Sequence, residues 1–412
     1  MLLRPMFFSL ATLVLLSACT AGTPSMNQYS LPYPPADEPQ AGDILHLPTG
    51  YAVDQETVVD HARRAQVVYV GETHDNPAAH QIQKQLLADL QRHHPGKVTL
   101  AMEMFTPSQQ PLLDRWIAGE LTEKAFLRDI DWYGTWGFDF ALYRDLLHLC
   151  REEQIRILGL NAENDLRRSL SRMTLEQLPA EDRSRLPELD FDDPHYLEMI
   201  DAFVAGHPMS AERREAFLRV QTLWDETMAE NLANYLQGRD SSHRVMVVAG
   251  GNHIAYGFGI PRRTFRRFPA SYLLIGTTET EESRQLDASR FMDVDTPEHP
   301  LLPYHFLYYT AYQPLPQTGV RLGVVVSADG EAGLLIDRLL PESAAEAHGL
   351  QAGDVLLTLD GVPLSEPFDL IYPLKQKTSG ETVELMLLRD AETLTVRVEF
   401  TPESQRPHGM PR

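Results

Sequence analysis

The sequence is poor in cysteine and in positive charge. Its 412 residues include only 2 cysteines, so at most one disulfide bond can form within the chain. Its 36 lysine and arginine residues are outnumbered by 58 aspartate and glutamate residues, which leaves a formal net charge of −22. This charge argues against binding to nucleic acid or to anionic lipid surfaces. Hydrophobic residues make up 43% of the chain, which is enough for globular folding, and the length favours two domains joined by linkers.

The N-terminus has the composition of an export signal. Arg4 precedes an apolar run at residues 6–16, which is too short to span a bilayer as a permanent helix. The run ends in Leu16-Ser17-Ala18-Cys19, which resembles the lipobox of bacterial lipoprotein precursors. This resemblance implies that residues 1–18 are a signal peptide and that Cys19 is lipidated, with palmitate among its acyl chains. The alternative is an ordinary signal peptide followed by a coincidental cysteine.

Residues 19–42 are predicted to form a flexible tether between this anchor and the globular part. They are rich in proline and have few aliphatic side chains, so they cannot build a core. Thr20, rather than aspartate, follows the cysteine, and by analogy with lipoproteins this indicates an outer-membrane lipoprotein that faces the periplasm. The second cysteine, Cys150, then has no disulfide partner, and its helical surroundings indicate a buried thiol.

Short β-type runs alternate with longer helical patterns from residue 66 onward. This alternation predicts an α/β fold with a mainly parallel, doubly wound sheet and helical insertions. An aromatic run at residues 304–310 would add an edge strand. The predicted strands before it cover residues 66–70, 97–102, 155–160, 244–249 and 271–275.

Polar residues follow most of these strands. The first strand leads into Gly71-Glu72-Thr73-His74 and the fourth into Gly250-Gly251-Asn252-His253, so both share a Gly-x-x-His pattern. The second strand ends at Glu103 and the third at Asn161. Because ligands of open α/β sheets bind beyond the carboxyl ends of the strands, we expect these side chains to face one cleft. Taken singly, Glu103 could instead cap a helix, and His74 could hydrogen-bond a carbonyl group.

The pattern changes near residue 314. Residues 316–402 contain short strands around a small helix, which predicts a separate β-rich domain. The preceding α/β domain is predicted to cover residues 43–312.

Several motifs in order resemble the ChaN family of haem-binding lipoproteins over residues 43–312. That family is similar to the Tiki and TraB proteins, proposed metalloproteases with paired Gly-x-x-His motifs and a strand-end glutamate, and more distantly to erythromycin esterases. The C-terminal domain resembles the PDZ domains of bacterial periplasmic proteins. The resemblance to ChaN rests on residues 71–76, 101–105, 221–231, 250–253 and 256–261, and the resemblance to PDZ domains on residues 321–324 and 349–354.

The ChaN resemblance implies a homodimer that holds haem in a shared pocket, with each iron coordinated by a tyrosine. Tyr256, close to His253, is the candidate ligand, because a phenolate oxygen suits ferric iron. Arg262 and Arg263 belong to a basic cluster that could bind the haem carboxylates, since arginine pairs well with carboxylate groups. The aromatic residues at 132–138 could line a flat apolar pocket. The alternatives are that Tyr256 and these aromatic residues are packing residues and that the arginines form a solvated helix face.

The resemblance to the wider superfamily implies a different chemistry, hydrolysis at a divalent metal such as zinc or manganese. His74, Glu103 and His253 would supply two imidazoles and a carboxylate and leave one position open for water. Glu72 would then act as the general base. The chain has no His-Glu-x-x-His motif, so these ligands would have to converge from separate strands. In a third interpretation, Glu72 and His74 act as base and acid on an ester without a metal.

The PDZ resemblance implies binding of a protein C-terminus by strand addition. The peptide carboxylate would be held near Arg321, Leu322, Gly323 and Val324. The alternative is a docking or dimerisation module without a peptide ligand. We therefore predict a lipid-anchored haem-binding protein of iron and haem acquisition whose PDZ domain recruits a periplasmic or outer-membrane partner. A divalent-metal-dependent peptidase or esterase is the alternative, so enzymatic activity is left open.

Overall fold

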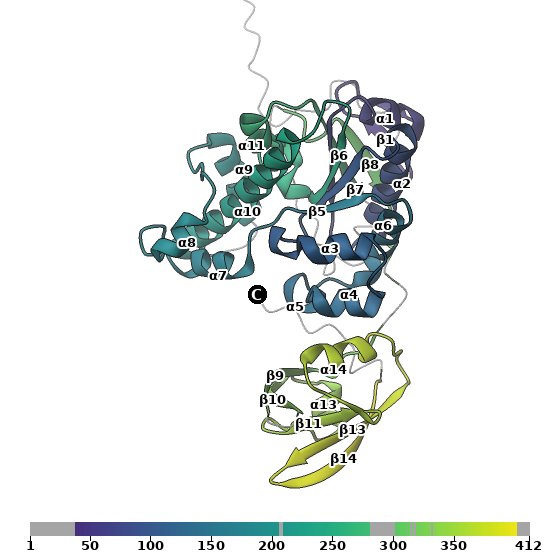
Figure 1. Cartoon of the computed structure of the whole chain (residues 1–412), viewed down its shortest axis with the longest axis vertical. Helices are drawn as coiled ribbons and strands as arrows, with labels where there is room; N and C mark the ends of the chain where they lie inside the picture. The colour runs from purple at the N-terminus through teal and green to yellow at the C-terminus, as the bar shows by residue number, and fades with distance from the viewer. Residues whose placement is uncertain are drawn as a thin grey trace, which may run out of the picture.

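The computed structural model describes residues 38–205, 209–280, 301–313, 315, 319–330 and 333–401. The predicted signal peptide, Cys19 and most of the predicted tether lie outside the described residues. An α/β unit is followed by a smaller β-rich unit (Figure 1). This arrangement confirms the predicted fold class.

The α/β unit is built on an eight-stranded sheet in the order β2-β1-β8-β7-β3-β6-β4-β5. The neighbours from β8 to β5 are parallel, whereas β1 is antiparallel to both β8 and β2. The strands are β1 (Ile44–His46), β2 (Tyr51–Val53), β3 (Val67–Glu72), β4 (Val98–Met102), β5 (Arg156–Gly159), β6 (Arg244–Gly250), β7 (Tyr272–Glu279) and β8 (Phe306–Thr310).

Strands β3 to β7 lie where the sequence predicts strands. The strand predicted at residues 304–310 is present as β8, but its predicted position at the edge of the sheet is wrong, because β8 pairs with β7 on one side and with β1 on the other. β1 and β2 continue the sheet beyond β8, and each is only 3 residues long. A strand that short has no detectable alternation of polar and apolar residues, so the sequence does not predict it.

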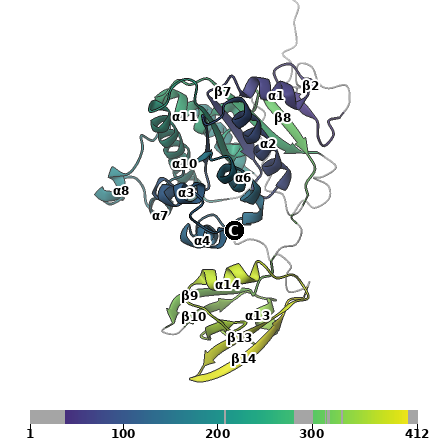
Figure 2. The same cartoon turned by 45° about the vertical axis from the view of Figure 1, so that its right-hand side comes forward.

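Helices cover both faces of this sheet (Figures 1 and 2). α2 begins at Pro77, where Asn76 accepts a hydrogen bond from the Ala78 amide at 2.9 Å and so caps the helix. The helices and 3₁₀ turns of the unit are α1 (Gln55–Ala62), α2 (Pro77–His93), η1 (Pro107–Gln109), α3 (Gln110–Ile117), α4 (Glu123–Asp129), α5 (Trp132–Thr135), α6 (Phe140–Glu152), α7 (Asn164–Arg172), α8 (Ala180–Ser184), α9 (Pro194–Ala205), α10 (Ala211–Gln237), η2 (Gly251–His253), η3 (Ala255–Gly257) and α11 (Ile260–Arg267).

The central strands divide their side chains between two cores. In β3, Val68 and Val70 belong to the core that includes residues of α2 and α6, whereas Val67 and Tyr69 belong to the core that includes residues of α10 and α11. Successive strand residues point to opposite faces, so a strand between two helical layers is apolar throughout. All of β3 is buried. Because β3 lies between β7 and β6, its carboxyl end is near the middle of the row of strand ends.

The C-terminal unit is an antiparallel sheet in the order β14-β13-β11-β10-β9, with β12 paired to β11. It has a hydrophobic core of its own, formed by residues between Val320 and Phe400. Among the described residues, no helix is both long and apolar enough to cross a bilayer. The elements are β9 (Val324–Gly330), β10 (Gly333–Leu339), α13 (Ala344–Ala347), β11 (Val355–Leu359), β12 (Val362–Pro363), α14 (Pro367–Leu374), β13 (Thr382–Arg389) and β14 (Glu392–Glu399).

Candidate functional site

The carboxyl ends of β3, β4 and β6 lie side by side, because β6 pairs with both other strands. Glu72 ends β3 opposite Gly250 at the end of β6, and Glu103 follows β4 directly. His74 follows β3 and His253 follows β6, each as the last residue of a Gly-x-x-His motif. The structure therefore brings these four predicted side chains to one edge of the sheet, where an α/β fold binds its ligands.

Glu72 is a buried carboxylate that accepts hydrogen bonds from several side chains. His74 Nδ1 donates to its Oε1 at 2.8 Å, and the Tyr143 hydroxyl donates to the same oxygen at 2.6 Å. Gln83 Nε2 donates to Oε2 at 2.6 Å. Burial alone would raise the pKa of Glu72, but the neighbouring charge of His80 and the bond from His74 lower it. A carboxylate with a lowered pKa and these donors is a weak base, so the geometry favours a role in orienting His74.

Glu103 and His253 form a second buried pair. The Gly250 amide donates to Glu103 Oε2 at 2.8 Å, and His253 Nε2 lies 3.5 Å from Oε1. Burial would raise the pKa of Glu103, but the charge of His253 and its hydrogen bond lower it to about 2. Glu103 is therefore ionised. Its side chain bonds the Gly250 amide and does not cap η1, which has Thr106 as its N-cap. It fixes the turn that follows β6.

Asp225 on α10 accepts a hydrogen bond from the second ring nitrogen of His253. His253 Nδ1 donates to Asp225 Oδ1 at 2.6 Å, and the Tyr196 hydroxyl donates to Oδ2 at 2.7 Å. Burial would lower the pKa of His253, but the charges of Asp225 and Glu103 raise it well above its usual value. His253 therefore lies between two carboxylates that favour its protonated form.

His74 and His253 approach each other across Gly250. A Cβ atom at this glycine would lie 3.0 Å from His74 Nε2 and 3.6 Å from His253 Cδ2, so a larger residue would crowd the site. The pKa of His74 is raised: burial lowers it, but the bond to Glu72 and the charge of Glu103 outweigh burial. The rings of Trp136 and Phe138 each lie 5.0 Å from the His74 ring, so both aromatic side chains are neighbours of His74.

The predicted metal ligands are neighbours, but they do not form a ready coordination site. In the parts of the chain that the structure describes, no three His, Cys, Asp or Glu side chains are spaced to hold a metal ion. Both imidazole Nδ1 atoms are already bonded to carboxylates, so only the Nε2 atoms of His74 and His253 could bind one. Asn161, at the end of β5, uses its side chain to accept the Ala162 amide at 2.8 Å and its own amide to bond Phe105 O at 2.9 Å.

Tyr256 has an unusual backbone. Its φ of 58° and ψ of −2° place a bulky aromatic residue in the left-handed region, inside the η3 turn that follows His253. The Tyr256 amide donates to Pro303 O at 2.9 Å, and its half-buried ring stacks on Phe258 at 5.6 Å. His195 stacks on Phe258 from α9 at 5.5 Å. The contacts around Tyr256 thus stabilise a backbone conformation that a tyrosine does not favour by itself.

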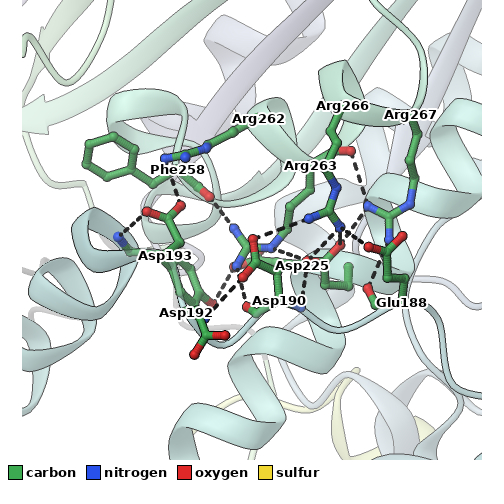
Figure 3. A network of polar contacts seen from close by, with 12 residues as sticks. Glu188, Asp190, Asp192, Asp193, Asp225, Phe258, Arg262, Arg263, Arg266 and Arg267 are labelled. Carbon is green, nitrogen blue, oxygen red and sulfur yellow. Dashed lines mark hydrogen bonds and ion pairs between the residues drawn. The ribbon is translucent and has the colours of Figure 1, made fainter.

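The arginines of α11 have different surroundings, although they are adjacent in sequence (Figure 3). The Arg262 side chain is 52% exposed and forms an ion pair with Asp193 at 2.8 Å. Arg263 is buried, with its Nε 3.0 Å from Glu226 and its guanidinium group 4.1 Å from the centre of the Tyr196 ring. Arg262 is therefore the accessible member of the predicted pair, whereas Arg263 is part of a buried ion pair.

Arg266 and Arg267 also pair with Glu226, at 3.3 and 2.6 Å. Acidic residues of the segment at 188–193 surround the outer side of this cluster (Figure 3). The basic cluster is thus neutralised by the chain's own carboxylates. Arg263, Arg266 and Arg267 therefore attach α11 to Glu226 of α10.

The predicted carboxylate-binding loop of the C-terminal unit precedes β9. Leu322 and Gly323 accept backbone hydrogen bonds from Ala345 and Leu340, each at 2.8 Å. Gly323 has a φ of +81°, and a Cβ atom there would lie 2.2 Å from Ser343 Cβ, so only glycine fits. Arg321 is exposed and Leu322 is buried. These contacts give the loop a defined backbone shape.

Sequence reasoning missed the residues that orient the site from the helices. Gln83 on α2 and Tyr143 on α6 bond Glu72, and Asp225 on α10 bonds His253. Asp225 and Glu226 lie inside the motif at residues 221–231. A pair of acidic residues on the largely apolar face of a long helix could have indicated that they contribute to the site. Cys150 is buried, as predicted, and Cys19 lies outside the described residues.

The fold and the residues at its strand ends define a doubly wound α/β domain with a candidate ligand site, joined to a small antiparallel β domain. Residues 58–264 match the family described as haem-binding uptake, Tiki superfamily, ChaN, and the chain belongs to this family. Residues 318–400 match the PDZ domain family. Both matches lie inside the ranges predicted for the two domains.

Among solved structures, ChaN of Campylobacter jejuni, described as binding haem cofacially, has a TM-score of 0.51 and 16% identity, and the similarity covers 66% of this chain and 98% of that one. At this identity the likeness shows the fold alone. The periplasmic serine endoprotease DegP of Salmonella typhimurium is 31% identical over 85 residues, which is 21% of this chain and 18% of DegP. A DegP-like protein of Halomonas elongata is 37% identical over 83 residues, again 18% of its length. The chain thus spans about a fifth of these curated relatives.

Proposed function

We propose that this protein binds haem for iron and haem acquisition, with Tyr256 as the iron ligand. Membership of the ChaN family supports haem binding, and the left-handed backbone of Tyr256 supports this residue as the ligand. A non-glycine residue in this conformation costs on the order of 1–3 kcal/mol, and such strain persists mainly at functional sites. The strain at Tyr256 would be explained if this backbone conformation directs the phenol group towards a bound ligand.

The residues around Tyr256 suit haem chemically. A phenolate is a hard anionic ligand for ferric iron, and the apolar ring of Phe258 stacks on that of Tyr256. Arg262 is exposed enough to meet a haem carboxylate, in exchange for Asp193. Bound haem would supply a ferric iron that the protein carries.

Haemin titration of the full chain in mild detergent tests this proposal. We expect saturable binding with a visible charge-transfer band from phenolate to iron, lost in Tyr256→Phe. Tyr51→Phe is the matched control, because Tyr51 is exposed on β2 at the far edge of the sheet. Absence of binding by the wild type would refute haem binding, whereas an unchanged band in Tyr256→Phe would refute only the ligand.

A metal-dependent peptidase or esterase is the second candidate, and one observation favours it. His74 and His253 both donate Nδ1–H to a carboxylate, as metal-binding histidines commonly do. Glu103 lies 3.5 Å from His253 Nε2 and would complete the ligand set. Such a metal, zinc or manganese, would supply a water molecule of lowered pKa.

Elemental analysis of the purified chain separates this candidate from haem binding. Stoichiometric zinc or manganese that is lost in His74→Ala, together with no uptake of haemin, would support the metal. His61→Ala, at an exposed position on α1, is the control. Metal content that does not depend on His74 would exclude this site.

The remaining parts of the proposal concern place and partner. Cys19 would carry the lipid anchor, with the protein on the outer membrane facing the periplasm, and two chains would share the haem pocket. The PDZ domain would bind the C-terminus of a periplasmic or outer-membrane partner at Arg321, Leu322, Gly323 and Val324. The shaped loop before β9 supports this last point.

A further inference from the structure

Helix α14 of the PDZ domain packs against α4 and α5 of the haem-binding domain, and both views show it on the side that faces them (Figures 1 and 2). The Phe368 ring lies 6.2 Å from the Tyr133 ring, and Lys124 lies 5.4 Å from the centre of the Tyr372 ring. Phe368 and Tyr372, one helical turn apart, pack against the core of the haem-binding domain. The outer face of α14 is therefore an apolar contact surface.

Charged residues flank this contact at both ends of α14. Lys375 forms an ion pair with Asp139 at 3.1 Å, and both side chains are about a quarter exposed, at 26% and 22%. Glu366 lies 3.9 Å from Arg128 on α4. Opposite charges at both ends are thus complementary across the contact between the two domains.

The opposite face of α14 belongs to the PDZ domain itself. Leu370 and Leu374 are buried in the PDZ core, and α14 packs beside β9, the last strand of the described sheet. The Val320 amide, just before the predicted carboxylate-binding loop, donates to Leu374 O at 2.9 Å. A peptide that adds to the edge of β9 would therefore contact α14 and the loop bonded to its end.

One chain of contacts leads from this helix to Glu72. Asp139, the partner of Lys375, caps α6 by accepting the Ala141 amide at 3.0 Å. Tyr143, one turn further along α6, donates its hydroxyl to Glu72 at 2.6 Å. A displacement of α14 thus acts on the cap of the helix that holds Glu72.

A second chain of contacts leads to His74. Tyr133, the partner of Phe368, lies on α5, and the Trp136 amide that ends this helix bonds Trp132 O at 3.0 Å. The Trp136 ring lies edge to face with His74 at 5.0 Å. Two separate contact chains therefore join α14 to the Glu72–His74 pair.

We propose that a peptide bound in the PDZ groove and a ligand bound at the Glu72–His74 site are energetically coupled through the contact of α14 with α4, α5 and α6. The peptide is one with a free C-terminal carboxylate and an apolar last residue. The inference rests on the proposed haem function only in naming haem as the site ligand. Coupling between sites amounts to roughly 5- to 150-fold in affinity and is reciprocal.

The test uses the full chain in detergent, haemin, and a decapeptide that ends in valine. Haemin affinity should change by about fivefold or more with saturating peptide, and peptide affinity should change by the same factor with haemin. The amidated decapeptide, which lacks the carboxylate, should have no effect. A second readout needs no haemin: in chain labelled with 5-fluorotryptophan, the ¹⁹F signal assigned by Trp136→Phe should shift when the peptide is added.

Lys375→Gln removes one surface ion pair and should greatly reduce both effects. Lys377→Gln is its matched control, because Lys377 pairs with Asp360 inside the PDZ domain at 3.2 Å and should leave them unchanged. Phe368→Ala with Tyr372→Ala removes the apolar part of the contact and should abolish both effects.

The outcomes separate this inference from the proposed function. If haemin does not bind, the haem proposal fails, and the Trp136 signal still decides the coupling. If the peptide binds without shifting that signal, or if the interface variants keep the full shift, the two domains are docked without coupling and the inference is wrong. Failure of the carboxylate-ended peptide to bind better than the amidated one would also overturn it.

Discussion

Replacing Asp225 by asparagine tests how His253 is held. The change keeps the size of the side chain but removes its charge, so the hydrogen bonds from His253 and from Tyr196 lose their charged acceptor. Hydrogen bonds to charged groups contribute about 1.5–3 kcal/mol and neutral ones about 0.5–1.5 kcal/mol. Each bond therefore weakens by about 1 kcal/mol, and the variant should lose about 2 kcal/mol of unfolding free energy. For a domain of this size, Tm should fall by about 4–8 °C.

The loss of unfolding free energy in Asp225→Asn should depend on pH. His253 has a pKa well above 6.5 in the folded protein, since the charge of Asp225 is the largest influence opposing burial. A histidine with a pKa raised by folding adds stability below its unfolded pKa of about 6.5, and this stability disappears as pH rises through the folded pKa. The difference between wild type and Asp225→Asn should therefore be largest below about pH 6.5 and should shrink as pH rises.

Chemical denaturation at a series of pH values measures this difference. Asp145→Asn is the control, because it removes a carboxylate from an exposed ion pair with Lys84, and such pairs contribute about 0–1 kcal/mol. A loss in Asp225→Asn that is no larger than the control, or one that grows with pH, would refute a protonated His253 between the two carboxylates.

Three further predictions follow from the described contacts. Glu226→Ala should lower the free energy of unfolding by about 3–5 kcal/mol, because it removes the carboxylate that lies 3.0 Å from the Nε of the buried Arg263; a loss under ~1 kcal/mol in urea would contradict the buried pair. Gly323→Ala should abolish peptide binding in fluorescence anisotropy, since a Cβ atom would meet Ser343 at 2.2 Å; unchanged affinity would reject the loop assignment. Cys19→Ser should abolish incorporation of radioactive palmitate in cells, and equal labelling of both chains would exclude Cys19 as the site of lipidation.

The central strands could be predicted from the sequence because burial on both faces requires continuous apolar runs. β3 and β6 are such runs, and their polar carboxyl ends indicated the place of the site. The short β1 and β2 could not be predicted, because strands of 3 residues have no measurable period. The placement of β8 inside the sheet depends on them and was mispredicted for the same reason.

The members of the site on strand ends were predictable, whereas their partners on helices were not. Whether Gln83, Tyr143 or Asp225 reaches a strand end depends on how α2, α6 and α10 cross the sheet, and periodicity does not encode crossing angles. The split between the exposed Arg262 and the buried Arg263 is also a consequence of tertiary packing. Likewise, no local sequence pattern predicts a tyrosine with a left-handed backbone conformation, such as Tyr256.

The resonance Raman spectrum of the haemin-loaded full chain tests the central claim most directly. With excitation in the visible charge-transfer band, we predict phenolate ring modes that shift when tyrosine is deuterated, persist in Tyr51→Phe and disappear in Tyr256→Phe. A loaded protein without phenolate modes, or one whose modes survive in Tyr256→Phe, would contradict the assignment of Tyr256 as the haem ligand.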